Sequence, residues 1–225
     1  IRVCICFGRR VCLFDGLLFD LDGTLWDSVD AICISWRRVL ERRTPELAGL
    51  MTRETVAGCM GMLLPDIVKK VLPDLPAEQL QPVLAELLAE ENSYVAAHGG
   101  ALYPQAPETL ALLAQSYPLC IVSNCQDGYI EAFFQAHGLG KYFTDYENPG
   151  RTGKGKADNI ALVAARNGMK RPLYIGDTQG DCDAATAAGV PFLHAAYGFG
   201  AIDHEVPFVR TFAEIPAAVA RLSPP

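Results

Sequence analysis

Short apolar runs and amphipathic segments alternate along most of the chain. The apolar runs, which predict strands, are residues 16–21, 119–122, 142–145 (the weakest pattern), 173–175 and 191–194. The amphipathic segments, which predict the intervening helices, are residues 108–115, 129–137, 157–167, 184–188 and 212–222. Strands that alternate with helices form parallel sheets covered on both faces, so we expect an α/β fold with a Rossmann-like, doubly wound parallel sheet.

One block of the chain interrupts this alternation. No strand pattern occurs between Asp27 and Gly100, and helical spacing predicts helices over residues 29–43, 65–72 and 77–97, with Ser28 as the N-cap of the first. An all-helical block after the first strand is typical of an inserted cap. We therefore expect an α/β core made of residues 1–27 and 101–225, and a small α-helical cap domain over residues 28–100.

Polar side chains follow three of the predicted strands. They are Asp20 and Asp22, then Ser123 and Asn124, then Asp177 and Asp181. In open parallel sheets, ligands bind beyond the carboxyl ends of the strands. We therefore expect these residues from distant parts of the chain to meet in one site.

The two acids of the first strand need compensation, because a buried carboxylate is costly. On a strand, Asp20 and Asp22 would point the same way, about 6.6 Å apart, so one could act as a nucleophile and the other could transfer a proton. Asp177 and Asp181 would add repulsion unless a hard divalent cation joined the group, and Mg²⁺ prefers such oxygen ligands. Gly23 allows a sharp turn and close approach of its amide to an anion.

These segments resemble the ordered motifs of the haloacid dehalogenase-like hydrolase superfamily. The motifs are DLDGTLWDS at residues 20–28, IVSN at 121–124, a downstream lysine, and YIGDTQGD at 174–181. The match extends from about Leu17 to the C-terminal helix. The helical insertion lies where the phosphoglycolate phosphatase and β-phosphoglucomutase group carries its cap.

The resemblance implies how the chemistry is divided. Asp20 would attack phosphorus and become an aspartyl phosphate, while Asp22 would protonate the leaving oxygen and then activate water. Ser123 and the lysine complete the catalytic set, and Gly23, Thr24 and Asn124 would bind the substrate's phosphoryl group.

The resemblance also implies a Mg²⁺ site. Asp20, the backbone carbonyl of Asp22, and Asp177 would hold the ion, and Asp181 would bind it directly or through water.

The segment GRTGKGKADNI offers two candidates for the lysine. A KxxxI spacing to Ile160 points to Lys156, which we favour as the catalytic residue. A spacing anchored on Asp158 points to Lys154, which stays a candidate for substrate binding. Either lysine would neutralise Asp20 and the incoming phosphate. The same segment nearly matches a nucleotide-binding P-loop, but Ala157 replaces the hydroxyl that this motif places on Mg²⁺.

An acid at position 22 favours reactions of phosphate monoesters, because dehalogenases of the superfamily lack it. We therefore expect a Mg²⁺-dependent phosphatase, a phosphoric monoester hydrolase that acts on a small phosphorylated metabolite through an aspartyl phosphate. A phosphomutase of the same fold is the first alternative. A receiver-like signalling module and a P-loop-like nucleotide-binding protein are the others.

The composition of the chain limits the kinds of partner that we expect. The 225 residues carry a net charge of −7, which gives no general attraction to nucleic acid or to an anionic membrane, and no apolar run is long enough to span a bilayer. The eight cysteines are scattered without a CxxC pair, which favours a reducing, cytoplasmic setting. We expect a monomer or small homo-oligomer. Residues 1–14 would form an extra hairpin or extend upstream of the first strand, and they show no signal-peptide cleavage site.

Overall fold

The computed structural model describes residues 14–73 and 75–222, so the hairpin considered for the N-terminal segment lies outside the described residues, apart from Phe14. At its centre is a parallel six-stranded sheet with the order β5-β4-β1-β6-β7-β8. The strands are β1 (Gly16–Phe19), β4 (Leu119–Val122), β5 (Phe143–Glu147), β6 (Pro172–Gly176), β7 (Phe192–Ala195) and β8 (Phe208–Val209). The prediction of a Rossmann-like parallel sheet is confirmed.

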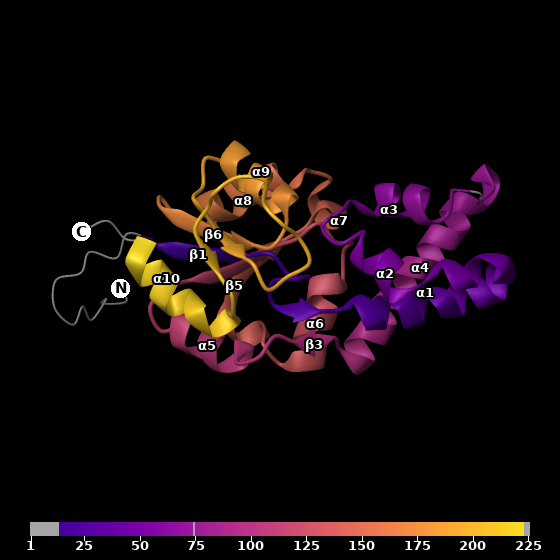
Figure 1. The fold of residues 1–225 in the computed structure, drawn as a ribbon, viewed down its shortest axis with the longest axis horizontal. Coiled ribbons are helices and arrows are strands. Elements are labelled where there is room, and N and C mark those ends of the chain that lie inside the picture. Colours follow the sequence, from indigo (N-terminus) through magenta and orange to yellow (C-terminus); the bar gives the residue numbers. More distant parts are fainter. Residues whose placement is uncertain (1–13, 74, 223–225) are drawn as a thin grey trace.

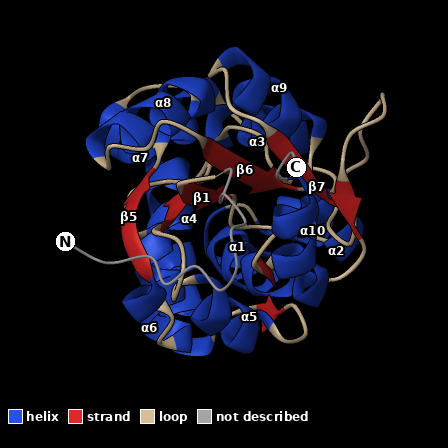
Figure 2. Cartoon of the chain, turned by 90° about the vertical axis from the view of Figure 1, so that its left-hand side faces the viewer, coloured by secondary structure: helices blue, strands red, loops and turns tan. Residues whose placement is uncertain are grey.

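Helices cover both faces of this sheet (Figure 2). On one side lie α5 (Ala106–Leu113), α6 (Tyr129–His137) and α10 (Ile215–Leu222), and on the other lie α8 (Lys156–Arg166) and α9 (Gln179–Ala187). Successive strand residues point to opposite faces. Accordingly, Leu17 and Phe19 of β1 belong to one core cluster, and Leu18 belongs to the other. Both faces are buried, as parallel sheets require.

All named elements of the insertion, which lies between residues 28 and 100, are helices. It contains α1 (Val29–Arg43), α2 (Arg53–Ala57), α3 (Leu64–Val71), α4 (Ala77–His98) and the 3-10 helix η1 (Pro45–Leu50). These elements bury an apolar cluster of their own, which includes Trp36, Leu40, Met51 and Leu87. The helices extend from one end of the sheet domain and give the molecule its long axis (Figure 1). A helical cap is therefore present, as predicted.

A short antiparallel ribbon joins the cap to the core. Its strands are β2 (Trp26–Asp27) and β3 (Ala101–Leu102). We expected no strand here, because a two-residue strand is too short to show alternation. Gln105, just before α5, has the only positive φ among the described non-glycine residues, at 64°. The predicted boundaries at 27/28 and 100/101 fall at this ribbon, and we propose it as the hinge.

The acids of the first motif lie beyond the strand instead of within it. β1 ends at Phe19, so the expectation that Asp20 and Asp22 share a strand face is wrong. The ninth helix also begins earlier than predicted, at Gln179, because Thr178 and Asp181 form a capping box around its first turn. The short elements α7 (Pro149–Thr152) and η2 (Gly140–Tyr142), like β8, gave no sequence pattern. The helix predicted over residues 212–222 begins as the 3-10 helix η3 (Phe212–Glu214) and continues as α10.

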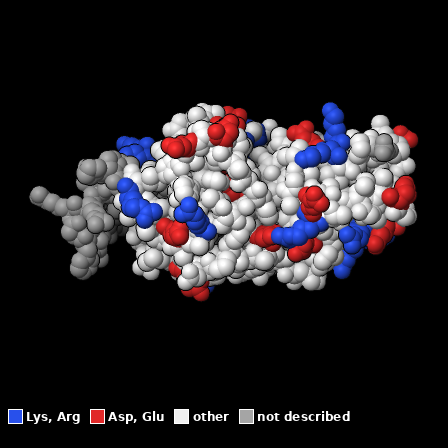
Figure 3. All heavy atoms as spheres, in the orientation of Figure 1, with Lys and Arg blue, Asp and Glu red and all other residues white. Residues whose placement is uncertain are grey.

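The surface carries charges of both signs. On the face drawn in Figure 3, Lys and Arg side chains are spread among Asp and Glu and do not gather into one patch. None of the helices that the structure describes is both long enough and apolar enough to cross a membrane. The cysteines within the described ranges are free thiols, and most of them are buried.

Candidate active site

Asp20 is the first residue after β1, at the carboxyl edge of the sheet. Its backbone N–H donates to the carbonyl of Ile175 on β6 (2.8 Å), which fixes the chain at this point. The side chain is 2% exposed, and its Oδ1 accepts a hydrogen bond from Lys156 Nζ at 2.8 Å. Asp20 is therefore a buried carboxyl group held by a cation.

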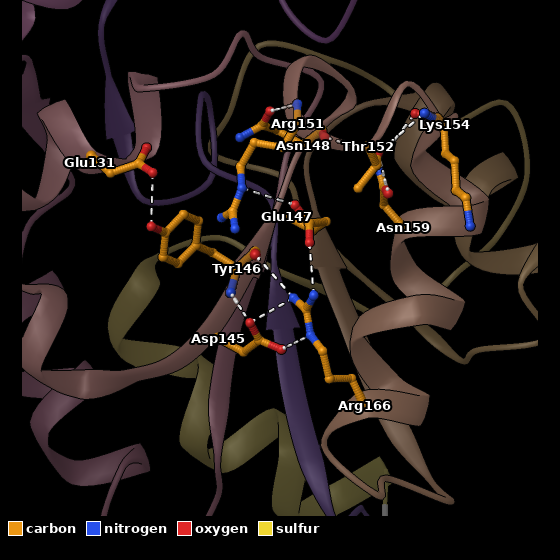
Figure 4. Close-up of polar contacts among 10 residues, drawn as sticks. All are labelled: Glu131, Asp145, Tyr146, Glu147, Asn148, Arg151, Thr152, Lys154, Asn159 and Arg166. Carbon is orange, nitrogen blue, oxygen red and sulfur yellow. Dashed lines mark hydrogen bonds and ion pairs between the residues drawn. The ribbon is translucent and has the colours of Figure 1, made fainter.

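Lys156 is the first residue of α8 and bridges two acids. Its buried Nζ lies 2.8 Å from Asp20 Oδ1 and 2.6 Å from Asp181 Oδ1. Burial alone would lower the pKa of this lysine, but Asp181 and Asp20 raise it well above its usual value, so the side chain stays charged. Lys154, the other candidate, is exposed and makes its contacts through its backbone (Figure 4).

A network of polar side chains holds the loop that presents Lys156 (Figure 4). Asn148 caps α7 by accepting from the backbone N–H of Arg151 (3.0 Å). The Thr152 hydroxyl donates to Asn159 Oδ1 (2.8 Å), and the same Asn159 side chain donates to the carbonyl of Lys154 (3.2 Å). These bonds tie the loop to the first turn of α8, so the lysine enters the site from a fixed backbone.

Asp181 is already satisfied by the protein. Its Oδ2 accepts from the backbone N–H groups of Asp177 (3.2 Å) and Thr178 (3.0 Å) and from the Thr178 hydroxyl (2.8 Å). Burial would raise its pKa, but Lys156 and these donors lower the pKa below its usual value. Asp181 is thus an ionised anchor for both Lys156 and the start of α9.

Asp177 and Asp20 are compensated less well. Carboxylate oxygens of Asp20, Asp177 and Asp181 lie within 4.8 Å of one another. Burial, followed by repulsion from the other two acids, raises the pKa of Asp177 to about 8. Burial and Asp181, partly offset by Lys156, raise the pKa of Asp20 to about 7. Three clustered acids therefore face one lysine, and their oxygens suit a hard divalent cation.

Two glycines pack directly against the Asp177 side chain, and a side chain at either position would overlap it. Gly23 has φ +81°, and a Cβ at that position would overlap the Asp177 carboxylate, as would a Cβ at Gly198. The N–H of Phe199 donates to Asp177 Oδ2 (2.7 Å), and the Thr24 hydroxyl lies 3.5 Å from Oδ1. Thr24, predicted to bind substrate, is fully buried and faces Asp177.

Asp22 occupies a different environment from the three clustered acids. Its Oδ1 accepts hydrogen bonds from Trp26 Nε1 (2.9 Å), from the Tyr129 hydroxyl (3.0 Å) and from the Ser28 hydroxyl. Desolvation nevertheless raises its pKa above the usual value. Ser28 is the N-cap residue of α1, as predicted, but its side chain makes no cap hydrogen bond, and its hydroxyl donates to Asp22 instead.

The second motif connects the core to the cap. Ser123 follows β4 and is buried, and its backbone N–H donates to the carbonyl of Glu147 (3.3 Å). The next residue, Asn124, donates through Nδ2 to the carbonyl of Gly61 (3.0 Å), in the turn between α2 and α3. This bond places the cap turn over the carboxyl ends of the strands.

Residues outside the predicted catalytic and binding set also contact the acids of the site. Tyr129 from α6 and Trp26 from the ribbon bind Asp22, and the backbone of Phe199 binds Asp177. Trp26 lies within the first motif, so the sequence places it near the site. No signal in the sequence assigns Tyr129 or Phe199, because each reaches the site only through the packing of a distant loop or helix.

The parallel sheet, the acids at its carboxyl edge and the helical insertion after β1 define a hydrolase core of the haloacid dehalogenase type. The chain belongs to the haloacid dehalogenase-like hydrolase family, whose model matches residues 17–195. It is 30% identical to phosphoglycolate phosphatase of Escherichia coli strain K12 over 226 aligned positions, covering 86% of this chain and 87% of that protein.

Solved structures agree with this assignment. A haloacid dehalogenase-like hydrolase from Bacteroides fragilis is 25% identical, with a TM-score of 0.76, over 90% of this chain and 99% of the other. A haloacid dehalogenase-like family hydrolase from Streptococcus pneumoniae, at 23% identity and TM-score 0.72, shares the fold over 92% of this chain and 99% of the other. The predictions of this family and of an enzyme that hydrolyses phosphoric monoesters are confirmed.

Removing the Lys156 cation should destabilise the fold. Lys156→Met leaves two buried acids unpaired, so we expect the free energy of unfolding at neutral pH to fall by about 3–5 kcal/mol. Urea denaturation at 25 °C measures the change. The deficit should shrink as the pH falls, because the unpaired acids then become protonated.

Lys154→Met is the matched control, since Lys154 is exposed two residues away, and it should change stability by less than about 0.5 kcal/mol. Equal effects of the two substitutions would contradict a structural ion pair at Lys156.

Proposed function

We propose that this enzyme is a Mg²⁺-dependent phosphatase that hydrolyses a small phosphorylated metabolite through an aspartyl phosphate on Asp20. The observation that carries the proposal is the buried cluster in which Asp20 is hydrogen-bonded to Lys156 (2.8 Å) and lies beside Asp177 and Asp181. A carboxylate nucleophile, a fixed cation and oxygen ligands for a metal thus converge at one point. Phosphoryl transfer depends mainly on such positioning and charge compensation.

Asp20 is the proposed nucleophile. One of its oxygens is held by Lys156, which stabilises the ionised, attacking form of the carboxylate. The bond from Asp20 to phosphorus forms as the bond from phosphorus to the leaving oxygen breaks. Water then cleaves the aspartyl phosphate and restores Asp20. Because Lys156 is also bonded to Asp181, it stays in place through both steps.

The clustered acids fit Mg²⁺. Asp20 and Asp177 would supply carboxylate oxygens, the backbone carbonyl of Asp22 would supply a third oxygen, and Asp181 would bind directly or through water. A bound Mg²⁺ ion supplies positive charge that neutralises the phosphoryl oxygens. Burial, followed by repulsion from neighbouring acids, raises the pKa values of Asp20 and Asp177, and a bound cation would offset both effects.

Asp22 is the proposed general acid and base. Desolvation raises its pKa, which favours the protonated form that can donate to the leaving oxygen. Trp26, Ser28 and Tyr129 all bond to Oδ1, which leaves Oδ2 for the transferred proton. After the alcohol leaves, the same carboxylate can take a proton from the attacking water.

The phosphoryl oxygens would be bound by groups at the strand ends. The hydroxyl of Ser123 and the backbone amides of Gly23 and Asn124 are the donors we propose for them, together with Lys156. The bond between Asn124 and Gly61 holds a turn of the cap beside these donors. A closed cap would exclude bulk water during transfer.

Asp20→Asn should abolish turnover without unfolding the protein. Removal of a covalent nucleophile reduces kcat on the order of 10⁴-fold or more, measured as phosphate release from p-nitrophenyl phosphate with Mg²⁺. Borohydride reduction of wild-type enzyme quenched during turnover should convert residue 20 to homoserine, detected by mass spectrometry. Asp183→Asn, at an exposed acid of α9, is the matched control with normal activity. Near-normal hydrolysis by Asp20→Asn would disprove the assignment.

Asp22→Asn should slow an alkyl phosphate far more than p-nitrophenyl phosphate in the first step. An alkoxide needs a proton to leave, so we expect about 10²–10⁴-fold loss there, whereas nitrophenolate leaves unaided. With p-nitrophenyl phosphate this variant should release one burst of nitrophenol and then stall, because the base for the second step is missing. Stopped-flow absorbance measures the burst. If the variant loses the same factor in rate on both esters and shows no burst, the assignment of Asp22 to proton transfer is wrong.

A further inference from the structure

A cavity lies between the cap and the core, beside Asp22. Its volume is about 60 Å³, several times the roughly 10–15 Å³ that one water site needs by the same measure, so it can hold part of a bound molecule. Most of the lining is apolar and comes from cap residues, which include Ile32, Trp36, Met51, Val56, Met60, Met62, Leu64, Ile67 and Val71. The core contributes Asp22, Asn124, Cys125, Gln126 and Tyr129.

The position of Asp22 in the wall suggests which part of a substrate the cavity would hold. The leaving oxygen of the substrate must lie within reach of the acid that protonates it. Asp22 lines the cavity, so under the proposed mechanism the carbon skeleton of the leaving alcohol would extend from that oxygen into the cavity. The groups on the cavity wall therefore select the alcohol.

The charge in the cavity is entirely acidic. Its lining includes two acids, Asp22 and Glu91, and among the described lining residues none is Lys, Arg or His. The nearest cap cations lie behind the wall and are bonded there. Arg53 pairs with Asp27 and Asp30. Lys70 donates to the carbonyl of Gly58 and lies 3.9 Å from Met62 Sδ, and Arg37 donates to the carbonyl of Met51 (2.6 Å). None of these cations is among the described lining residues.

Glu91, from α4, is held rigidly in the wall. It is 5% exposed, and it accepts hydrogen bonds from Trp36 Nε1 and from Gln126 Nε2 (2.9 Å). Gln126 is in turn anchored by Asn92 Oδ1 (3.0 Å). These bonds hold the Glu91 carboxyl group, which lines the cavity, in a fixed position. Burial, weakly reinforced by Asp22, raises the pKa of Glu91 to about 7 against these hydrogen bonds.

Asn124 adds a second acceptor. Its Nδ2 donates to the carbonyl of Gly61, which fixes the orientation of the amide. Its Oδ1 is buried and has no hydrogen-bond partner in the described structure. A buried acceptor left unpaired is costly, so a donor on the bound molecule would satisfy it. The apolar wall, the two acceptors and the lack of a lining cation together indicate the chemistry of the group that would bind here.

We propose, on the basis of the function proposed above, that the substrate is the phosphate monoester of a small, largely apolar alcohol that carries a hydroxyl or ammonium donor and no negative charge. Phosphoglycolate, the substrate in the name of the Escherichia coli relative, is then a poor substrate, because its carboxylate would face Glu91 without a cation. The ester's apolar carbons contact the cap, and its donor bonds to Glu91 and Asn124.

Four esters of similar size test this selection in the wild-type enzyme with Mg²⁺. They are 2-hydroxyethyl phosphate, O-phosphoethanolamine, propyl phosphate and 2-phosphoglycolate, with p-nitrophenyl phosphate as a reference for the catalytic machinery. We expect kcat/KM for the better of the first two to exceed that for phosphoglycolate by about 100-fold or more, since like-charge contacts are strongly unfavourable. The first two esters together distinguish an uncharged donor from a cationic one.

A matched pair of variants tests the role of Glu91. Glu91→Gln removes the charge and should narrow the gap between hydroxyethyl phosphate and phosphoglycolate at least about tenfold, with little change for p-nitrophenyl phosphate. Glu90→Gln alters the neighbouring acid, which pairs with Arg38 and Arg42 outside the cavity, and should leave the gap unchanged.

The outcomes separate the two proposals. If the enzyme hydrolyses phosphoglycolate as fast as the donor-bearing esters, and also hydrolyses p-nitrophenyl phosphate, the inference is overturned. The proposed phosphatase mechanism would still stand. Propyl phosphate as the best substrate would overturn the part of the inference that requires a donor. No hydrolysis of any ester, p-nitrophenyl phosphate included, would overturn the proposed function and the inference with it.

Discussion

The rest of the site depends on the buried ion pairs of Lys156 with Asp20 and Asp181. Lys156 enters from the first turn of α8, and the two acids come from the ends of β1 and the start of α9. A charge buried this deeply persists only when it is paired, so the three elements are locked in one arrangement. In the mechanism proposed above, the same pairing also prepares Asp20 for attack, which links the stability of the fold to its chemistry.

The pairing leaves a deficit of positive charge, and that deficit explains the surroundings. One lysine faces three clustered acids, with Asp22 a short distance along the chain. A divalent cation would offset this deficit at the sheet edge and would also neutralise the negative charge of an incoming phosphoryl group. Among the described residues that line the adjoining cavity there is no Lys, Arg or His, and Glu91 adds a carboxyl group. Under the two proposals, positive charge would therefore be concentrated on the phosphate and not on the alcohol.

Much of the fold could be predicted from the sequence, because the strands of the sheet are continuous apolar runs and the cap helices have clear periodicity. The acids Asp20, Asp177 and Asp181 were predictable for a related reason, since each follows such a run. The choice between Lys156 and Lys154 required coordinates, because it depends on which side of the α8 start faces inward. Tyr129 and Glu91 could not be assigned a role, because their contacts join residues 35 or more positions apart.

A crystal structure with Mg²⁺ and beryllium fluoride tests most directly whether these acids form one phosphoryl-transfer centre, because beryllium fluoride bonded to a carboxylate mimics an acyl phosphate. We predict the fluoride group on the free oxygen of Asp20, a metal ion between Asp20 and Asp177, and the pairing of Lys156 with Asp181 retained. Beryllium fluoride on another residue, or a metal bound away from Asp177, would contradict the account.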